Sequence, residues 1–268
     1  MAPASLGAAY RRFWQEVGEQ FPDLGGAAST AYYLENEKRL LTEHVPDLAR
    51  SAVLKTDLWD EVKNTRILQW VHGQGAAVFG VDISEPTVRQ ARAAFSDGGL
   101  RATVADVRSL PYRDGRFDAI YSMGTIEHFR DPETALREMH RVLRPGGRAV
   151  VGVPNRWDPF LRPLLASALQ AARLYGYGYE RSFSRRALRR MLETAGFEVV
   201  ELEPLGGLWS TVAVELSYGL QRYRRPWSAP AVDATCRSMQ WLASRWERVD
   251  RQPKFSWNHL VVGRRPLA

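Results

Sequence analysis

The chain has 268 residues, of which 45% are hydrophobic and 25% charged, a composition that suits one large globular domain with an insertion. No apolar run reaches the ~18 residues that a membrane-spanning helix needs. Near the start, Arg11, Arg12 and Glu16 stand where a signal peptide needs apolar side chains, so we expect a cytoplasmic protein. The single cysteine, Cys236, excludes a disulfide framework within the chain and a cysteine-rich zinc site.

The net charge is +7, which permits binding to nucleic acid, to acidic metabolites or to a membrane surface. Much of this charge comes from arginines within 181–190 and 222–265. In the string "RSFSRRALRRMLETAGF" the arginines recur on the polar side of a helical pattern, which favours a solvated helix face.

Between about residues 49 and 203, short β-branched runs alternate with helical patterns. The expected strands are 76–83, 102–105, 117–122, 148–153 and 197–202, and the expected helices are 86–94, 132–143 and 185–195. Ser84 is a plausible cap for the first of these helices, and Pro145-Gly146-Gly147 ends the second. Repeated strand–helix units predict a mostly parallel sheet with helices on both faces and ligands at the carboxyl ends of the strands.

The remaining segments flank this core. We expect a helical N-terminal segment at 1–48, a core at 49–206, a helical cap insertion at 207–256, and a last strand and tail at 257–268. Further apolar helices are expected within 155–182 and around 209–223 and 229–249, and the last strand at 259–262. A helical insertion before a last strand suggests a cap over the site.

Two placements are open for the first strand. If it occupies 66–68, only 69–76 remains for a loop, a helix and a turn, whereas a crossover between parallel strands needs about a dozen residues. If it occupies 51–55, a two-residue loop leads into a helix at 58–72, and Gly73 and Gly75 form the turn that follows.

The second placement has local support. Asp57 can cap the helix, with Asp60 and Glu61 in its first turn, where acidic groups suit the helix dipole. Asp82 then follows the loop at close to the ~20-residue spacing typical of a dinucleotide-type site. We therefore favour 51–55.

Three strings resemble those of class I S-adenosylmethionine-dependent methyltransferases of the small-molecule, type 11-like kind. They are "VFGVDISEPTVRQAR", "VADVRSLPYRDGRFDAIYSMGTIEHFRDPETALREMHRVLRPGGRAVVGVPN" and "YERSFSRRALRRMLETAGFEVVELE". The resemblance covers roughly residues 48–203. It implies a Rossmann-like, doubly wound, mostly parallel seven-stranded α/β sheet, with S-adenosylmethionine as the cofactor.

The resemblance also implies cofactor contacts at matching positions. Asp82 is similar to the acidic residue that accepts hydrogen bonds from both ribose hydroxyls. The other implied contacts are Ile83 on the adenine face, Asp106 and Val107 near the adenine amino group, and Ser122 and Met123 beside the methionine part. From the residues alone, Asp82 can also be a helix cap and Asp106 a turn residue.

The first motif departs from the family. There an acidic residue is followed by G-x-G-x-G, because the backbone approaches the cofactor too closely for a Cβ atom. The matching stretch here, 54–61, has no glycine. We expect Lys55, Thr56 and Asp57 to bind the cofactor, with Lys55 on its carboxylate, whereas the bulky Leu58 and Trp59 conflict with the usual pose.

Methyl transfer needs the acceptor and the methyl group in line and, for a hydroxyl acceptor, a base. His128 in "TIEHF" is the candidate base, and Glu127 is expected to orient it or replace it; a structural role for His128 remains an alternative. Tyr32 and Tyr33 are candidates to close over the site, or ordinary packing residues. No metal ligands are assigned.

The leading hypothesis is methylation of a small molecule, lipophilic or a secondary metabolite, at oxygen. The alternative is a methyltransferase-fold protein that no longer transfers methyl and binds a ligand or catalyses another reaction. Nucleic acid is disfavoured as a substrate, because Ser122-Met123-Gly124-Thr125 stands where methyltransferases of exocyclic base amines commonly carry Asn/Asp-Pro-Pro-aromatic.

The cap insertion is rich in tryptophan. The insertion contains Trp209, Trp227, Trp241 and Trp246, and Trp257 lies just beyond it. We favour an apolar lid over the acceptor pocket, and peripheral contact with a membrane stays the alternative. The oligomeric state does not follow from the sequence.

Overall fold

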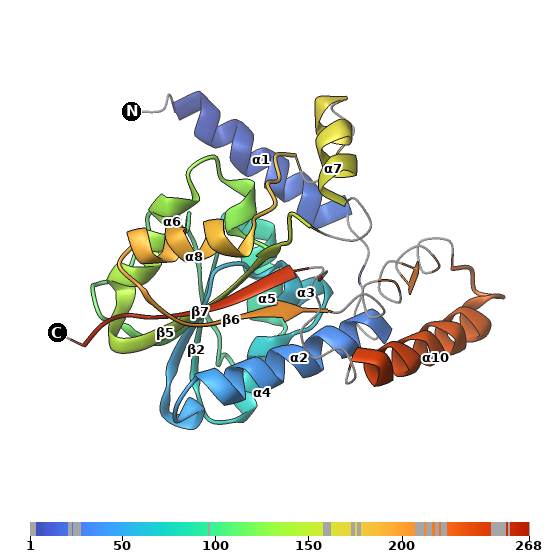
Figure 1. Ribbon diagram of the computed structural model, residues 1–268, viewed down its shortest axis with the longest axis horizontal. Helices are drawn as coiled ribbons and strands as arrows, with labels where there is room; N and C mark the ends of the chain where they lie inside the picture. Colours follow the sequence, from blue (N-terminus) through green and yellow to red (C-terminus); the bar gives the residue numbers. More distant parts are fainter. Residues whose placement is uncertain are drawn as a thin grey trace.

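The computed structural model describes residues 4–20, 23, 28–95, 97–157, 162–172, 175, 178–206, 212, 216–217, 220, 224–247, 256 and 258–267. Its strands form a seven-stranded sheet in the order β3-β2-β1-β4-β5-β7-β6 (Figure 1). The strands are β1 (Ala52–Lys55), β2 (Ala77–Asp82), β3 (Arg101–Val104), β4 (Phe117–Met123), β5 (Leu143–Pro154), β6 (Glu198–Leu205) and β7 (Asn258–Arg264). The first five pair in parallel, and β7 is antiparallel to both β5 and β6. The predicted doubly wound, mostly parallel sheet is confirmed.

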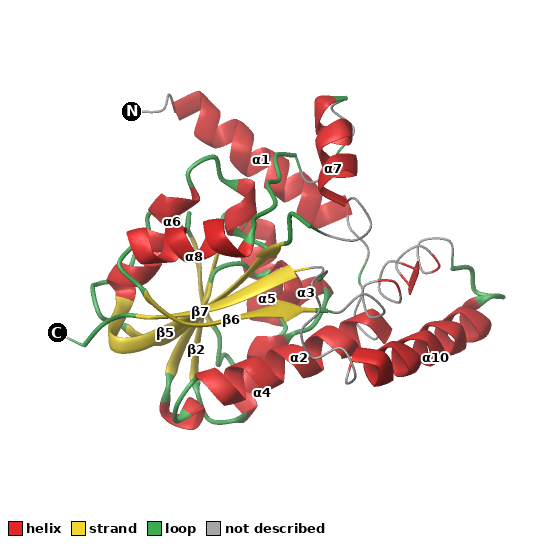
Figure 2. Ribbon diagram, in the orientation of Figure 1, coloured by secondary structure: helices red, strands yellow, loops and turns green. Residues whose placement is uncertain are grey.

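Helices cover both faces of this sheet (Figure 2). They are α1 (Ala4–Gln20), α2 (Ala28–His44), α3 (Trp59–Lys63), α4 (Ile67–Gly73), α5 (Glu85–Ala93), α6 (Pro132–Val142), α7 (Arg162–Ala171), α8 (Arg185–Thr194) and α10 (Ala229–Glu247), with the 3-10 turns η1 (Leu48–Arg50) and η2 (Ile126–His128). Residues of α6 and α8 pack into one core against the sheet, and residues of α2, α4 and α5 pack into a second core on the other face.

Local capping explains where the helices flanking the site begin. The Ser84 hydroxyl accepts a hydrogen bond from Thr87 N at 3.4 Å and caps α5, as the sequence predicted. The Asp131 carboxylate does the same for α6, accepting from Thr134 N at 3.2 Å. Each cap fixes the start of a helix at the carboxyl edge of the sheet.

The first strand is β1, flanked by β2 and β4, so the placement at 51–55 is confirmed. The single helix expected at 58–72 is wrong, because α3 ends at Lys63 and α4 begins at Ile67, with Arg66 left-handed at φ 54° between them. The Glu61 carboxylate accepts Leu68 N at 3.2 and 3.1 Å and so satisfies an amide at the start of α4. The proposed cap at Asp57 is also wrong, since Leu58 precedes α3 and provides no side-chain cap.

The predicted helices at 1–48, within 155–182 and near 229–249 are present as α1 and α2, α7, and α10. The helix α10 packs against α2 (Figure 1). Most of the segment 209–223, Trp209, Trp257 and the side chain of Trp246 lie outside the described residues. Among the residues that are described, no helix is both long and apolar enough to cross a membrane.

Two tryptophans assigned to the cap can be placed. Trp227 is 85% exposed and Trp241 is 56% exposed. Neither side chain is enclosed as the apolar lid over a pocket would require. The domain limits and a cap built from other residues of 207–256 stay predictions.

Candidate active site

Successive crossovers leave the sheet in opposite directions at the carboxyl ends of β1 and β4. Sheets of this kind bind ligands at that point, which we call the crevice. Thr56 N donates to Tyr121 O at 3.1 Å, which holds the residue after β1 against β4. The Thr125 hydroxyl lies 3.3 Å from the Thr56 hydroxyl and donates to Asp57 Oδ2 at 3.3 Å. These contacts bring the predicted Thr56 and Asp57 to one place, and Thr125 joins them.

Asp82, at the end of β2, is fixed by two backbone amides. Its Oδ2 accepts Leu58 N at 2.9 Å and its Oδ1 accepts Ser84 N at 2.8 Å. Burial raises the pKa of this carboxyl group. A carboxylate oxygen has two acceptor positions, so each oxygen keeps one for a further donor. The carboxylate is therefore pre-positioned and able to accept both hydroxyls of a diol.

The glycine-free turn folds without blocking the crevice at Leu58. This side chain is fully buried and packs over β2, where a Cβ atom on Gly80 would lie 2.4 Å from Leu58 Cδ2. The glycine that permits close approach is thus Gly80, in the strand beneath the turn. The Leu58 side chain therefore points into the core, and the conflict with a cofactor that was expected from Leu58 and Trp59 stays a prediction for Trp59.

Lys55 is enclosed by acidic groups. Its side chain is fully buried, and Nζ lies 3.1 Å from Asp57 Oδ1, 3.5 Å from Asp60 Oδ2 and 3.8 Å from Glu61 Oε1. It also donates to the backbone oxygen of Asp57 at 3.1 Å. The expected contact between Lys55 and a cofactor carboxylate finds no support, because the ammonium group already binds the turn itself.

A fourth carboxylate reaches the same cluster from α2. Glu37 is 3% exposed and accepts the Tyr121 hydroxyl at 2.7 Å. Burial raises the pKa of Glu37 to about 8, with the charge of Asp60 adding to the effect. Burial likewise raises the pKa of Asp57 to about 6 and that of Glu61 to about 7. We call Lys55, Glu37, Asp57, Asp60 and Glu61 the Lys55 cluster.

Asp57 links this cluster to the crevice. Its side chain is 20% exposed, whereas those of Lys55 and Glu61 are fully buried. It belongs to the glycine-free stretch 54–61 and places a carboxylate there. Asp57 therefore gives the turn a negative charge at the crevice, and the buried ammonium group of Lys55 lies beside that carboxylate.

The predicted adenine-side residues differ in their availability. The Asp106 carboxylate binds the Arg108 guanidinium through two nitrogens, with Nε–Oδ1 at 2.9 Å and Nη2–Oδ2 at 2.6 Å. That guanidinium in turn lies over the rings of Phe129 and Tyr10, at 4.7 and 5.4 Å from their centroids. Val107 is 4% exposed and belongs to the core. Asp106 thus already has a charged partner.

The remaining predicted cofactor residues, Ile83, Ser122 and Met123, differ in how far their side chains are buried. Ile83 and Met123 are half-buried, and the side chain of Ser122 is fully buried. Met123 packs against Gly152, which tolerates it only for lack of a Cβ atom. Backbone atoms of Ser122 and Met123 can line a ligand site there, and their roles stay predictions.

The helix α1 supplies residues that the sequence reasoning missed. Gly18 packs against the start of α5, where a Cβ atom would lie 3.1 Å from Thr87 Oγ1. Further along, the Trp14 ring lies 4.7 Å from the His128 ring in an edge-on arrangement. Tyr10, Trp14 and Gly18 recur every four residues, so one face of α1 extends from the start of α5 to η2. That spacing was the available signal.

His128 and Glu127 sit in η2, just after β4. His128 Nδ1 lies 2.9 Å from Tyr179 O, and because a carbonyl can only accept, Nδ1 carries the proton and Nε2 is the basic nitrogen. Glu127 is 3% exposed, and its backbone oxygen accepts Arg181 N at 3.0 Å. Tyr33 packs near Met123 in a small cluster with Leu40. The closing role of Tyr32 and Tyr33 stays a prediction.

Known proteins match this chain in sequence. Residues 63–151 match the family model of a methyltransferase domain. A demethylmenaquinone methyltransferase of Thermus thermophilus is 36% identical over 143 residues, covering 47% of this chain and 65% of that protein. An O-methyltransferase, cnsE, of Penicillium expansum is 28% identical over 229 residues, covering 75% of this chain and 74% of that protein. This chain spans 49%, 65% and 44% of the length of the first three curated relatives.

Solved structures match it in fold. The [4+2]-cyclase SpnF superposes with a TM-score of 0.58 at 19% identity, covering 88% of this chain and 81% of that one. A Haemonchus contortus phosphoethanolamine N-methyltransferase in complex with S-adenosyl-L-methionine gives 0.60 at 16% identity, covering 87% of this chain and 52% of that one. With the sheet order, these likenesses show that the chain has the fold of class I S-adenosylmethionine-dependent methyltransferases, and residues 63–151 match a methyltransferase domain.

Proposed function

We propose that the protein transfers a methyl group from S-adenosylmethionine to an oxygen of a small, lipophilic acceptor. The observation that carries this proposal is the Asp82 carboxylate, which two backbone amides fix at the crevice with one acceptor position left on each oxygen. A vicinal diol such as that of a ribose fits this arrangement. S-adenosylmethionine supplies an electrophilic methyl group on a sulfonium.

The crevice also has the charge to select that cofactor. S-adenosylmethionine carries two cationic groups, the sulfonium and the α-ammonium. Asp57 and Asp82 place two carboxylates at the crevice, and opposite charges close together stabilise the ionised forms of both partners. We assign Asp82 to the ribose, Ile83 to the adenine face and Asp57 to the α-ammonium group.

On the acceptor side, His128 is the proposed base. Its Nδ1 donates to Tyr179 O, so Nε2 is the basic nitrogen that would take a proton from an acceptor hydroxyl. The edge of Trp14 packs on the imidazole, and Phe13 packs on Trp14 at 5.3 Å. This apolar wall favours a lipophilic acceptor and limits the access of water. Glu127 is assigned the positioning of η2.

Calorimetric titration of the full chain tests the proposal with two ligands. S-adenosylhomocysteine has both halves of the cofactor, and 5′-methylthioadenosine lacks its amino-acid part. We expect both to bind, the first more tightly. No binding of either ligand at millimolar concentration would sink the proposal.

The variant Asp57→Asn is expected to weaken S-adenosylhomocysteine by about 10-fold or more, because a hydrogen bond to a charged group contributes about 1.5–3 kcal/mol. The affinity for 5′-methylthioadenosine should stay within about 2-fold, since that ligand has no ammonium group for Asp57 to bind. The matched control is Asp60→Asn, which removes another carboxylate bound to Lys55, 3.5 Å from its Nζ, without touching the crevice. Equal losses for both ligands would rule out the assignment of Asp57.

A second candidate is a protein of this fold that no longer transfers methyl. The observation that favours it is the acidic turn, since side chains replace glycines where the family's backbone meets the cofactor. One of the fold neighbours, SpnF, is a [4+2]-cyclase. In the same titration, binding of neither nucleoside would favour this second candidate over the first.

A further inference from the structure

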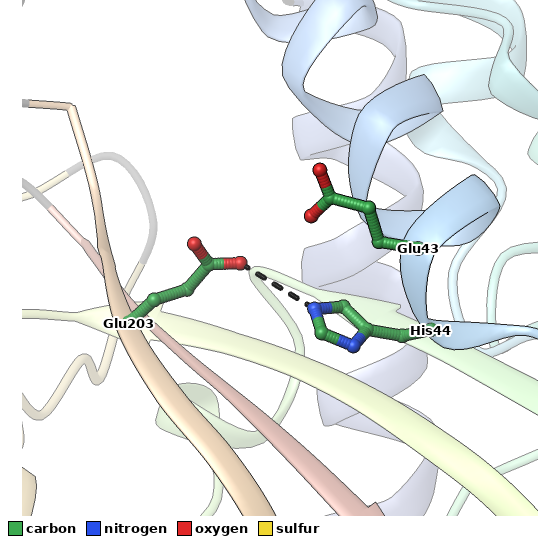
Figure 3. Close-up of side chains that lie close together, drawn as sticks. All are labelled: Glu43, His44 and Glu203. Atoms are coloured by element: carbon green, nitrogen blue, oxygen red, sulfur yellow. Dashed lines mark ion pairs between the residues drawn. The ribbon is translucent and has the colours of Figure 1, made fainter. Parts of the chain in front are cut away.

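A cluster of carboxylates and one histidine joins the last turn of α2 to β6 (Figure 3). Glu43 and His44 come from α2, and Glu203 faces the imidazole from β6. Glu201, two residues before it on the same side of the strand, also faces His44. One ligand atom from each of Glu43, His44 and Glu203 lies within 4.8 Å of the others.

The His44 side chain is buried, and its Nε2 atom points into this cluster without a hydrogen-bond partner among the described residues. Its side chain is 8% exposed, and Nε2 lies 3.5 Å from Glu201 Oε2 and 3.7 Å from Glu203 Oε1. Within the described part of the chain, neither Nε2 of His44 nor Oε1 of Glu203 has a hydrogen-bond partner. An unsatisfied buried polar group costs about 1–3 kcal/mol, so such a pair needs an explanation.

The spacing suits a shared metal ion. Two ligands held about 2.1 Å from a tetrahedral ion are about 3.4 Å apart. The separations of 3.5 and 3.7 Å are close to that value and too long for good hydrogen bonds. The ion would also give His44 Nε2 and Glu203 Oε1 the partner that they lack.

Arg39 holds the two flanking carboxylates in place. It donates to Glu43 Oε2 at 2.6 Å and to Glu203 Oε2 at 3.2 Å, so both contacts use the Oε2 atoms. Partners of this kind orient metal ligands in known sites. Three glutamates and one arginine leave a net charge of −2 around a neutral imidazole, which a divalent cation would neutralise.

We propose that Glu43, His44 and Glu203 bind a divalent transition-metal ion, with Glu201 as an additional oxygen ligand. Mixed imidazole and carboxylate ligands suit borderline ions such as Zn²⁺. Glu43 and Glu201 are 49% and 50% exposed, so water can complete the coordination.

The role of this ion would be structural. The backbone oxygen of His44 accepts Arg148 Nη1 at 3.1 Å, and Arg148 lies in the middle of β5, paired with β4 and β7. In the sheet, β4, β5 and β7 separate β6 from β1, the strand that leads into the glycine-free turn. Since β6 lies at the edge of the sheet, where β7 is its one neighbour among the described strands, an ion there would tie it to α2, the helix that carries Glu37.

The test is Zn²⁺ binding to the full chain without an affinity tag. We expect one ion per chain, a rise in melting temperature with Zn²⁺, and visible absorption bands when Co²⁺ replaces Zn²⁺. In His44→Gln and Glu203→Gln the affinity should fall by at least about 10-fold, and the thermal shift should vanish. The matched control is His72→Gln, because His72 Nε2 makes an ordinary contact of 2.7 Å with Asp97.

Two results would overturn the proposal. One is a wild-type chain that takes up no Zn²⁺ at micromolar concentration. The other is stoichiometric binding that both His44→Gln and Glu203→Gln retain, which would place the ion elsewhere. Using two variants guards against misfolding of either one, and circular dichroism verifies the fold of each.

Discussion

Lys55→Met is expected to lower the free energy of unfolding by about 3–5 kcal/mol at neutral pH, because it leaves buried carboxylates without their cation. Methionine approximates the volume of the lysine side chain, so the change removes charge more than packing. The Nζ atom is the cation within 3.8 Å of Asp57, Asp60 and Glu61, and its own side chain is fully buried. Water cannot replace it there.

The loss of unfolding free energy in Lys55→Met should depend on pH. The pKa of Glu37 in the folded chain is raised from 4.5 to about 8, and that of Glu61 from 4.5 to about 7. Between pH 4.5 and about pH 8, the folded state therefore binds more protons than the unfolded state, and the free energy of unfolding falls as the pH rises. Without Lys55 the carboxyl pKa values rise further, so the gap between variant and wild type should widen from pH 5 to pH 8.

Urea denaturation of both proteins at about pH 5 and pH 8 measures this gap. The control is Lys38→Met, whose exposed pair with Glu35 at 2.8 Å should contribute less than about 1 kcal/mol at either pH. A Lys55→Met protein within about 1 kcal/mol of wild type at pH 8, or a gap that narrows with rising pH, would contradict the account of the Lys55 cluster.

The sheet was predictable because its signals are local. Ser84 begins α5 through its own side-chain cap, and β2 and β4 are apolar runs. The position of β1 followed from the length that a crossover needs. None of these arguments depends on residues far away in the sequence.

The direction in which Lys55 points was not predictable in this way. All four residues of β1 are buried, because a central parallel strand is covered on both faces, so alternation gives no clue to which side chain meets the crevice. The partner that completes the cluster, Glu37, contacts Tyr121 across 84 positions of sequence. The break between α3 and α4 is similar, since no glycine or proline marks residues 64–66.

Asp82→Asn is expected to weaken S-adenosylhomocysteine and 5′-methylthioadenosine alike, by about 100-fold or more. Two hydrogen bonds from a ribose to a charged acceptor contribute about 1.5–3 kcal/mol each, and both ligands carry the ribose. An asparagine also has only one acceptor oxygen. Because Leu58 N and Ser84 N bind different oxygens of Asp82, one of these amides would then face the NH₂ group.

The asparagine would also destabilise the glycine-free turn. Leu58 N, inside the glycine-free turn, would lose its acceptor, so the unfolding free energy should also fall by about 1–3 kcal/mol. The control is Asp131→Asn, since asparagine caps a helix about as well as aspartate and this cap belongs to α6. Calorimetric titration of Asp57→Asn and of Asp82→Asn separates the roles of the two crevice carboxylates. If Asp82→Asn lost only S-adenosylhomocysteine and kept 5′-methylthioadenosine, Asp82 would bind the amino-acid half, and the assignments of Asp57 and Asp82 would have to be exchanged.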